Sequence, residues 1–240
     1  MDIAWVASEM APFSKTGGLA DVAGALPKAL AARGHRVLAI SPRYKAIEGA
    51  VNSGVKFLVR LFGVDHLCEL YVLDRDGVRW VLVDNPCYHR GGIYGDETGA
   101  YDDNLFRYAL LSRAAIETVR FLPAFDGRPM ADDTVFHAND WHTGLLPVYL
   151  KALYQPLGAL RGARVVLGLH NLGHQGTTNA VTARPTPTVP AAPLRRTRRL
   201  VVSRSPGRSA RGVEGSVSVS SEASAVPYST PESTAAPPAP

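Results

Sequence analysis

The segment from Lys15 to Leu26 carries the residues best suited to holding an anion. It reads KTGGLADVAGAL, follows an apolar run at residues 3–7 and opens a helical pattern. The first amides of a helix have no intrahelical partner and lie at the positive end of the helix dipole. Gly17 and Gly18 let a ligand approach the backbone, and Lys15 adds a full charge. The segment matches neither the P-loop nor the G-x-G-x-x-G pattern, so the residues alone leave the anion open.

Two interpretations of this segment assign different roles to Asp21. In an ordinary glycine turn between a strand and a helix, Asp21 offsets the helix dipole from within the first turn or so. In a ligand site, the same carboxylate accepts hydrogen bonds from sugar hydroxyls. Thr16, beside the glycines, belongs to the same candidate site.

A second polar cluster, NDWHTG, occupies residues 139–144 directly after an apolar run. We expect His142 to donate a hydrogen bond to a ligand hydroxyl or to stabilise developing charge. Asp140 caps the next helix or orients the histidine. A capping loop with a packed Trp141 is the alternative for these last two residues.

Polar side chains follow two more predicted elements. His170 and Asn171 end another apolar run, and residues 94–104 form a loop that begins at Tyr94. We interpret most of that loop as a surface connection with a helix cap. The histidines have no helical or finger-type spacing beside further ligands, so we expect no metal site.

The elements that position these clusters alternate between strand and helix. Continuous apolar runs typical of strands buried on both faces lie at residues 3–8, 36–41, 80–84, 134–138 and 165–170. Helical patterns occupy residues 19–33, 103–120 and 143–154, with a kink or short break expected at Pro27. Residues 55–83 instead form a β-hairpin excursion with a turn at 74–77. The pattern predicts an α/β fold with a Rossmann-like, doubly wound sheet that binds ligands at the carboxyl ends of its strands.

Composition divides the chain near residue 176. The net charge of +5 arises entirely from residues 177–240, which are rich in proline, arginine, serine and alanine and poor in large aliphatic residues. Such a segment buries too little apolar surface to fold, so we predict a domain at 1–176 and a disordered tail at 177–240. The cysteines at 68 and 87 predict core thiols in a reducing compartment. We expect no membrane span, and no targeting segment is visible at the N-terminus.

Taken together and in this order, these motifs resemble the glycogen and starch synthases that use ADP-glucose. The resemblance rests on SEMAPFSKTGGLADV at 8–22, GHRV at 34–37, PRY at 42–44, NDWHTG at 139–144 and HNLGHQG at 170–176. It covers roughly residues 2–176 and is nearer the plant and algal soluble starch synthases than the bacterial enzymes. The resemblance implies the N-terminal half of a two-domain GT-B glycosyltransferase.

That family transfers glucose from ADP-glucose to the non-reducing end of an α-1,4-glucan, with retention and without a metal or other cofactor. By resemblance, Lys15, Thr16, Gly17 and Gly18 bind the donor. The implied catalytic residues are His142, which lies beside the transferred glucosyl unit, and Asp21, which binds sugar hydroxyls. The same resemblance implies that Tyr94 and Asn171 contact the substrate. The implied compartment is the plastid stroma for a plant or algal protein, and otherwise the cytoplasm.

The family pattern stops after Gly176, and the second domain that supplies most of the nucleotide pocket is not visible. We therefore expect little or no synthase activity from this chain alone. The alternative is a non-catalytic glucan-binding or regulatory module derived from a starch synthase.

Two further alternatives carry less support from the residues. The arginines at 195–199 suggest a nucleic-acid or nuclear-targeting tail, but no aromatic residues interleave with them, so we expect no nucleic-acid partner. Other nucleotide-sugar transferases share the two-domain fold, although the lysine–glycine turn fits the ADP-glucose group better.

Overall fold

The structure, a computed structural model, describes residues 1–177. The tail predicted to be disordered lies, apart from Thr177, outside the described residues. The domain boundary predicted at residue 176 therefore remains a prediction.

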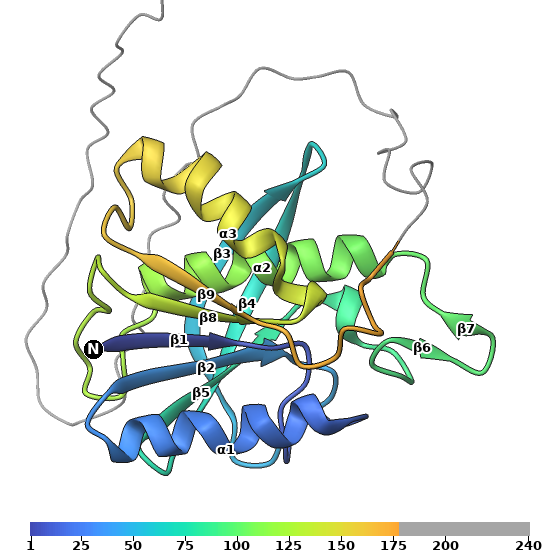
Figure 1. Ribbon diagram of the computed structural model, residues 1–240, viewed down its shortest axis with the longest axis horizontal. Helices are drawn as coiled ribbons and strands as arrows, with labels where there is room; N and C mark the ends of the chain where they lie inside the picture. Colours follow the sequence, from blue (N-terminus) through green and yellow to red (C-terminus); the bar gives the residue numbers. More distant parts are fainter. Residues whose placement is uncertain (178–240) are drawn as a thin grey trace, which may run out of the picture. The chain divides into compact units, whose positions relative to one another are not determined.

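A mixed sheet of seven strands forms the centre of the described domain, in the order β3-β4-β5-β2-β1-β8-β9 (Figure 1). Its parallel strands are β1 (Asp2–Val6), β2 (Arg36–Pro42), β5 (Val78–Asp84), β8 (Val135–Asn139) and β9 (Arg164–Gly168). When the five parallel strands are numbered along the chain, their order across the sheet is 3-2-1-4-5, that of a Rossmann half. The predicted α/β doubly wound fold is confirmed.

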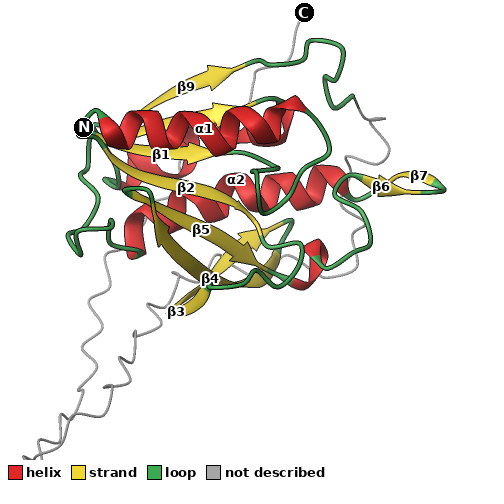
Figure 2. Ribbon diagram, turned by 90° about the horizontal axis from the view of Figure 1, so that it is seen from below, coloured by secondary structure: helices red, strands yellow, loops and turns green. Residues whose placement is uncertain are grey.

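Helices cover both faces of this sheet. The helix α1 (Gly18–Ala32) packs on one face, and α2 (Asn104–Phe121) packs on the other (Figures 1 and 2). Beside α2 lies α3 (Leu145–Tyr149), which continues into a π-helical turn at Leu150–Tyr154 and a 3-10 turn at Gln155–Leu157. Each face therefore has its own hydrophobic core, and β1 is buried along its whole length.

The predicted β excursion is present as an antiparallel extension of the same sheet. The hairpin β3 (Val51–Leu61) and β4 (Val64–Arg75) joins β5 through a turn at Asp76 and Gly77. Both turn residues have positive φ, as a tight hairpin turn with the right strand twist requires. A smaller hairpin, β6 (Gly95–Asp96) and β7 (Gly99–Ala100), lies in the loop between β5 and α2.

Of the kink or short break expected at Pro27, the break is absent, because α1 runs through this residue without interruption. Proline removes one hydrogen bond, but Pro27 lies on the buried face of α1 with Leu19 and Ala23, where tertiary packing holds the turn. Gly34 follows the helix with φ of +83° and donates its N–H to Ala31, as a helix-ending glycine does.

Candidate functional site

A cavity of about 710 Å³ opens at the carboxyl ends of β1 and β8. These strands flank the point where strand order reverses, which is where doubly wound sheets bind ligands. The lining combines the predicted residues with several that sequence reasoning left without a role: Glu9, Thr16, Gly17, Gly18, Leu19, Val22, Tyr94, Ala100, Asn104, Asp140, Trp141, His142, His170, Asn171 and His174.

The glycine turn before α1 lies at the wall of this cavity, as its sequence predicts. Close packing holds it there, because a Cβ on Gly24 of α1 would lie 2.6 Å from the carbonyl oxygen of Ala11. The chain's own Glu9 already occupies part of the turn. Its Oε2 accepts hydrogen bonds from the amides of Thr16 and Gly17 and from the Thr16 hydroxyl.

Lys15 and Asp21 are paired with each other and do not line the cavity. The Lys15 ammonium lies 2.6 Å from Oδ1 of Asp21, and both side chains are more than half exposed. Asp21 instead borders a shallow hollow between α1 and the turn that follows β4, beside Gly24 and Lys28. Of the predicted site residues, these two lie outside the cavity that contains the other six. An exposed pair of this kind contributes little to stability, so a ligand could separate it at low cost.

His142 is held in an aromatic enclosure. Its ring stacks on Tyr94 at 4.8 Å between centroids, meets Tyr108 edge-on at 4.7 Å and lies 4.2 Å from Trp141. Burial, with a smaller contribution from His174, lowers the pKa of His142 to about 3. The imidazole is therefore neutral at physiological pH. Its Nδ1 is buried without a partner among the described residues, which favours the tautomer with the proton on Nε2.

Tyr94 is presented to the cavity by the long loop between β5 and α2. Its hydroxyl lies 2.7 Å from Oγ of Ser8 at the end of β1, and its carbonyl oxygen accepts hydrogen bonds from Tyr101 and Asn104. Burial raises the pKa of Tyr94, so the phenol stays protonated. Tyr94, a predicted substrate contact, lines the cavity, and so does Asn104, at the end of the loop interpreted mostly as a surface connection.

Asp140 joins the two loops that follow β8 and β9. Its Oδ1 accepts the backbone N–H groups of His170 at 2.7 Å and Asn171 at 3.4 Å. Its carbonyl oxygen accepts the N–H and hydroxyl of Thr143, at the end of the turn that carries His142. Asp140 thus orients the His142 turn and the Asn171 loop together. It makes no side-chain cap to the following turn.

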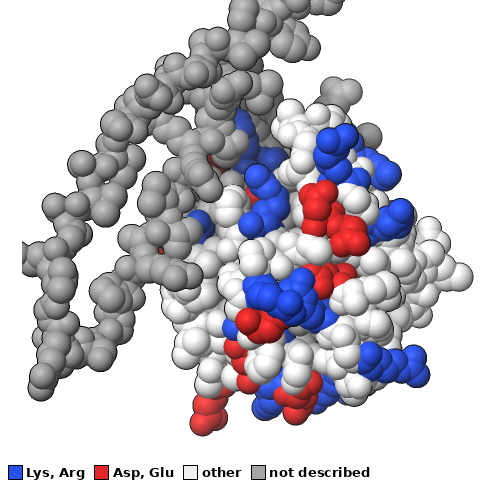
Figure 3. All heavy atoms as spheres, turned by 90° about the vertical axis from the view of Figure 1, so that its left-hand side faces the viewer, with Lys and Arg blue, Asp and Glu red and all other residues white. Residues whose placement is uncertain are grey.

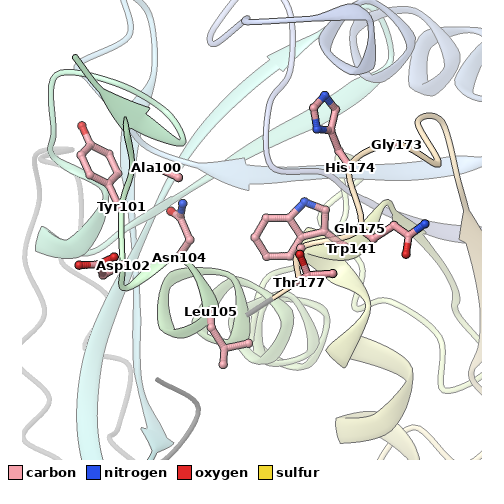
Figure 4. Close-up of a pocket in the computed structure, with 11 residues that line it drawn as sticks. Ala100, Tyr101, Asp102, Asn104, Leu105, Trp141, Gly173, His174, Gln175 and Thr177 are labelled. Atoms are coloured by element: carbon pink, nitrogen blue, oxygen red, sulfur yellow. The ribbon is translucent and has the colours of Figure 1, made fainter. Parts of the chain in front are cut away.

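A second hollow, of about 530 Å³, adjoins the first and shares Ala100, Asn104, Trp141 and His174 with it. Figure 4 shows Tyr101 and Asn104 on one side of this hollow and Trp141 and His174 on the other. Gly176 passes directly over the indole, where a Cβ would lie 2.2 Å from the Trp141 ring. Only glycine allows the chain to pass this close.

Within residues 1–177, no group of three or more His, Cys, Asp or Glu side chains lies close enough to hold a metal ion. No helix in this part of the chain is sufficiently long and apolar to cross a membrane. On the face seen in Figure 3, acidic and basic side chains are interspersed, so it offers no positive patch typical of nucleic-acid binding. The arginines at 195–199 lie outside the described residues.

The low pKa of His142 predicts a pH-dependent stability. The unfolded chain takes up this proton near pH 6.5, whereas the folded protein does so only near pH 3. Because the unfolded state binds more protons between these values, the free energy of unfolding falls as the pH is lowered through this window. The expected contribution is up to about 1.4 kcal/mol per pH unit.

Urea unfolding of the wild type and of His142→Gln between pH 7 and 4 measures this contribution. The variant should lose less stability than the wild type as the pH falls. Burial also lowers the pKa of His137, but that residue is unchanged in both proteins and cancels in the comparison. Parallel stability curves for the two proteins would show that His142 is not kept neutral by the fold.

Comparison with known proteins gives one family and a consistent set of relatives. Residues 2–200 match the family described as the starch synthase catalytic domain. Starch synthase 1 of Arabidopsis thaliana, a chloroplastic/amyloplastic protein, is 47% identical over 189 residues, covering 75% of this chain and 29% of the relative. Soluble starch synthase 2-1 of Oryza sativa subsp. japonica, also chloroplastic/amyloplastic, is 48% identical over 179 residues, covering 73% and 23%.

A solved structure agrees with these relatives. The catalytic domain of starch synthase IV from Arabidopsis thaliana, bound to ADP and acarbose, superposes with a TM-score of 0.64 and 27% sequence identity. The match covers 76% of this chain and 36% of that structure. The chain thus spans about 29% of the length of the first curated relatives it matches.

Proposed function

Because the chain belongs to the family of starch synthase catalytic domains, we propose that its cavity binds ADP-glucose and the non-reducing end of an α-1,4-glucan. The reaction served is transfer of the glucosyl unit to the glucan 4-hydroxyl with retention. The observation that carries the proposal is the single cavity that unites the amino end of α1 with the neutral His142. The related structure that binds ADP and acarbose supports the same substrate classes.

The roles of the individual residues follow from their chemistry. The amides at Gly18 and Leu19 begin α1 and suit the diphosphate, which Lys15 could reach after leaving Asp21. His142, with its proton on Nε2, suits a hydrogen bond to a hydroxyl of the transferred sugar. Tyr94, which stacks on His142, and Asn171 also line the cavity and suit further sugar contacts. Asp21, outside the cavity, would need to move before it could bind a sugar hydroxyl.

We propose that this function needs no metal or other cofactor, because the glucosyl donor is already activated by its diphosphate. The relatives are chloroplastic/amyloplastic proteins, which supports the plastid stroma as the compartment.

We expect the 240-residue polypeptide to bind ADP-glucose but to transfer its glucosyl unit only slowly. The cavity lining contains the carboxylates of Glu9 and Asp140 and no lysine or arginine from residues 1–177. Transfer expels an ADP anion, and each missing electrostatic contact to such a group costs about 10²–10³ in rate. We expect measurable ADP-glucose binding but transfer at least about 10³-fold slower than that of a full-length relative.

Isothermal titration with ADP-glucose tests binding, and radiolabelled transfer to glycogen tests catalysis, with UDP-glucose as the control donor. Rapid transfer by the polypeptide would contradict the argument from the cavity lining. A cavity lining without lysine or arginine from residues 1–177 is also compatible with a second function, that of a non-catalytic glucan-binding module. Co-sedimentation with glycogen in the absence of ADP-glucose binding would favour that module.

A further inference from the structure

Glu9 is a buried carboxylate that no basic side chain neutralises. It follows β1 directly, is 3% exposed, and takes part in no ion pair within residues 1–177. The nearby cation, Lys15, is paired with Asp21 instead. A buried charge without a cation is costly unless hydrogen bonds replace its hydration.

Those hydrogen bonds come from the start of α1, and they reach only one oxygen of the carboxylate. Oε2 accepts the Thr16 amide at 2.5 Å, the Thr16 hydroxyl at 2.8 Å and the Gly17 amide at 3.3 Å. The positive end of the helix dipole adds to their stabilisation. Glu9 therefore satisfies two of the amides that the glycine turn would otherwise offer to a ligand.

The other oxygen, Oε1, accepts no backbone hydrogen bond from the part of the chain that the structure describes. Glu9 lines the cavity beside Tyr94, and its charge helps to raise the pKa of that phenol. An ionised carboxylate accepts hydrogen bonds and donates none. Its free oxygen can therefore bind a hydroxyl of a ligand, whereas a phosphate placed beside it is repelled.

We propose that Glu9 determines which part of the donor contacts the glycine turn. Its Oε1 accepts a hydrogen bond from a hydroxyl of the glucosyl unit, and its negative charge excludes phosphate from the Thr16 and Gly17 amides. The diphosphate must then use the amides that follow, at Gly18 and Leu19. This inference rests on the proposed function, and it adds a specificity-determining residue to that function.

Glu9→Gln is the informative variant. To keep the hydrogen bonds from Thr16 and Gly17, the glutamine must place its oxygen where Oε2 lies, which turns its NH₂ group toward the cavity. The cavity then presents a donor in place of an acceptor and loses a negative charge. We expect the ratio of ADP-glucose to ADP affinity to fall by about tenfold or more, a typical effect of losing a hydrogen bond to a charged group. Affinity for ADP itself should rise.

Isothermal titration with ADP and with ADP-glucose measures this ratio for the wild type, Glu9→Gln and Glu48→Gln. The last variant makes the same charge change at an exposed position in the connection between β2 and β3. The affinity ratio should change only in Glu9→Gln. An unchanged ratio, or an equal loss of both ligands, would overturn the proposal.

A second measurement keeps this test separate from that of the proposed function. If the wild type binds neither nucleotide, the proposed function fails, and titration with inorganic pyrophosphate then decides the role of Glu9. The amide NMR signals of Thr16 and Gly17 should shift at lower pyrophosphate concentration in Glu9→Gln than in the wild type. An identical response in the two proteins would show that Glu9 does not keep anions from the turn.

Discussion

Replacing Asp140 with alanine is expected to lower the free energy of unfolding by about 3 kcal/mol, whereas glycine should cost less than about 1 kcal/mol. The backbone of Asp140 has φ of 56° and ψ of −174°. This conformation strains any residue with a Cβ by about 1–3 kcal/mol. Alanine keeps the strain and loses the hydrogen bonds to His170 and Asn171, while glycine loses the bonds but relieves the strain.

The same two substitutions should both weaken ligand binding, although only alanine is expected to lower stability strongly. Both alanine and glycine release the loop that carries Asn171 from the turn that carries His142. The glycine variant is therefore expected to be nearly as stable as the wild type, yet to bind ADP-glucose at least about tenfold more weakly. Asparagine keeps Oδ1 as an acceptor and tolerates positive φ, so it should largely restore both properties.

Urea unfolding and isothermal titration of the three Asp140 variants distinguish strain from hydrogen bonding. Equal stability of the alanine and glycine variants would show that the backbone conformation stores no strain. Tight binding by the glycine variant would show instead that the carboxylate does not position the loop.

The sheet and the place of the site were predictable because they depend on local patterns. Residues 3–8 and 36–41 are continuous apolar runs, which are typical of strands covered on both faces. Parallel strands end at one edge of the sheet, so the residues after β1, β8 and β9 had to lie close together. Thr16, His142 and Asn171 do line one cavity.

The details of the loops were not predictable, because tertiary contacts decide them. Nothing in the segment around Lys15 indicates that this side chain pairs with Asp21 rather than facing a ligand. Glu9 carries one signal, an acidic residue directly after a buried strand, but its hydrogen bonds depend on how the turn folds back. The positive φ of Asp140 has no sequence signature at all, since glycine would be the expected residue there.

The fold of the loop that presents Tyr94 was not predictable for a further reason, which is that it depends on a buried arginine in α2. Arg107 is fully buried and donates hydrogen bonds to the carbonyl oxygens of Cys87 and Ile93 and to Oδ1 of Asn104. Its guanidinium also lies within 6 Å of four tyrosine rings, those of Tyr44, Tyr88, Tyr101 and Tyr108. These contacts fold the loop that presents Tyr94 against α2.

Replacing Arg107 with lysine should therefore destabilise the protein by about 3 kcal/mol, although the charge is conserved. A single ammonium cannot reach the three acceptors that the planar guanidinium spans, and it stacks less well on the tyrosine rings. Urea unfolding measures the loss, and Arg128→Lys is the matched control, since Arg128 is exposed and pairs with Asp126 at the surface. The control should change stability by less than about 0.5 kcal/mol. A similarly small effect at position 107 would show that the charge alone, and not the shape of the guanidinium, holds the loop that carries Tyr94.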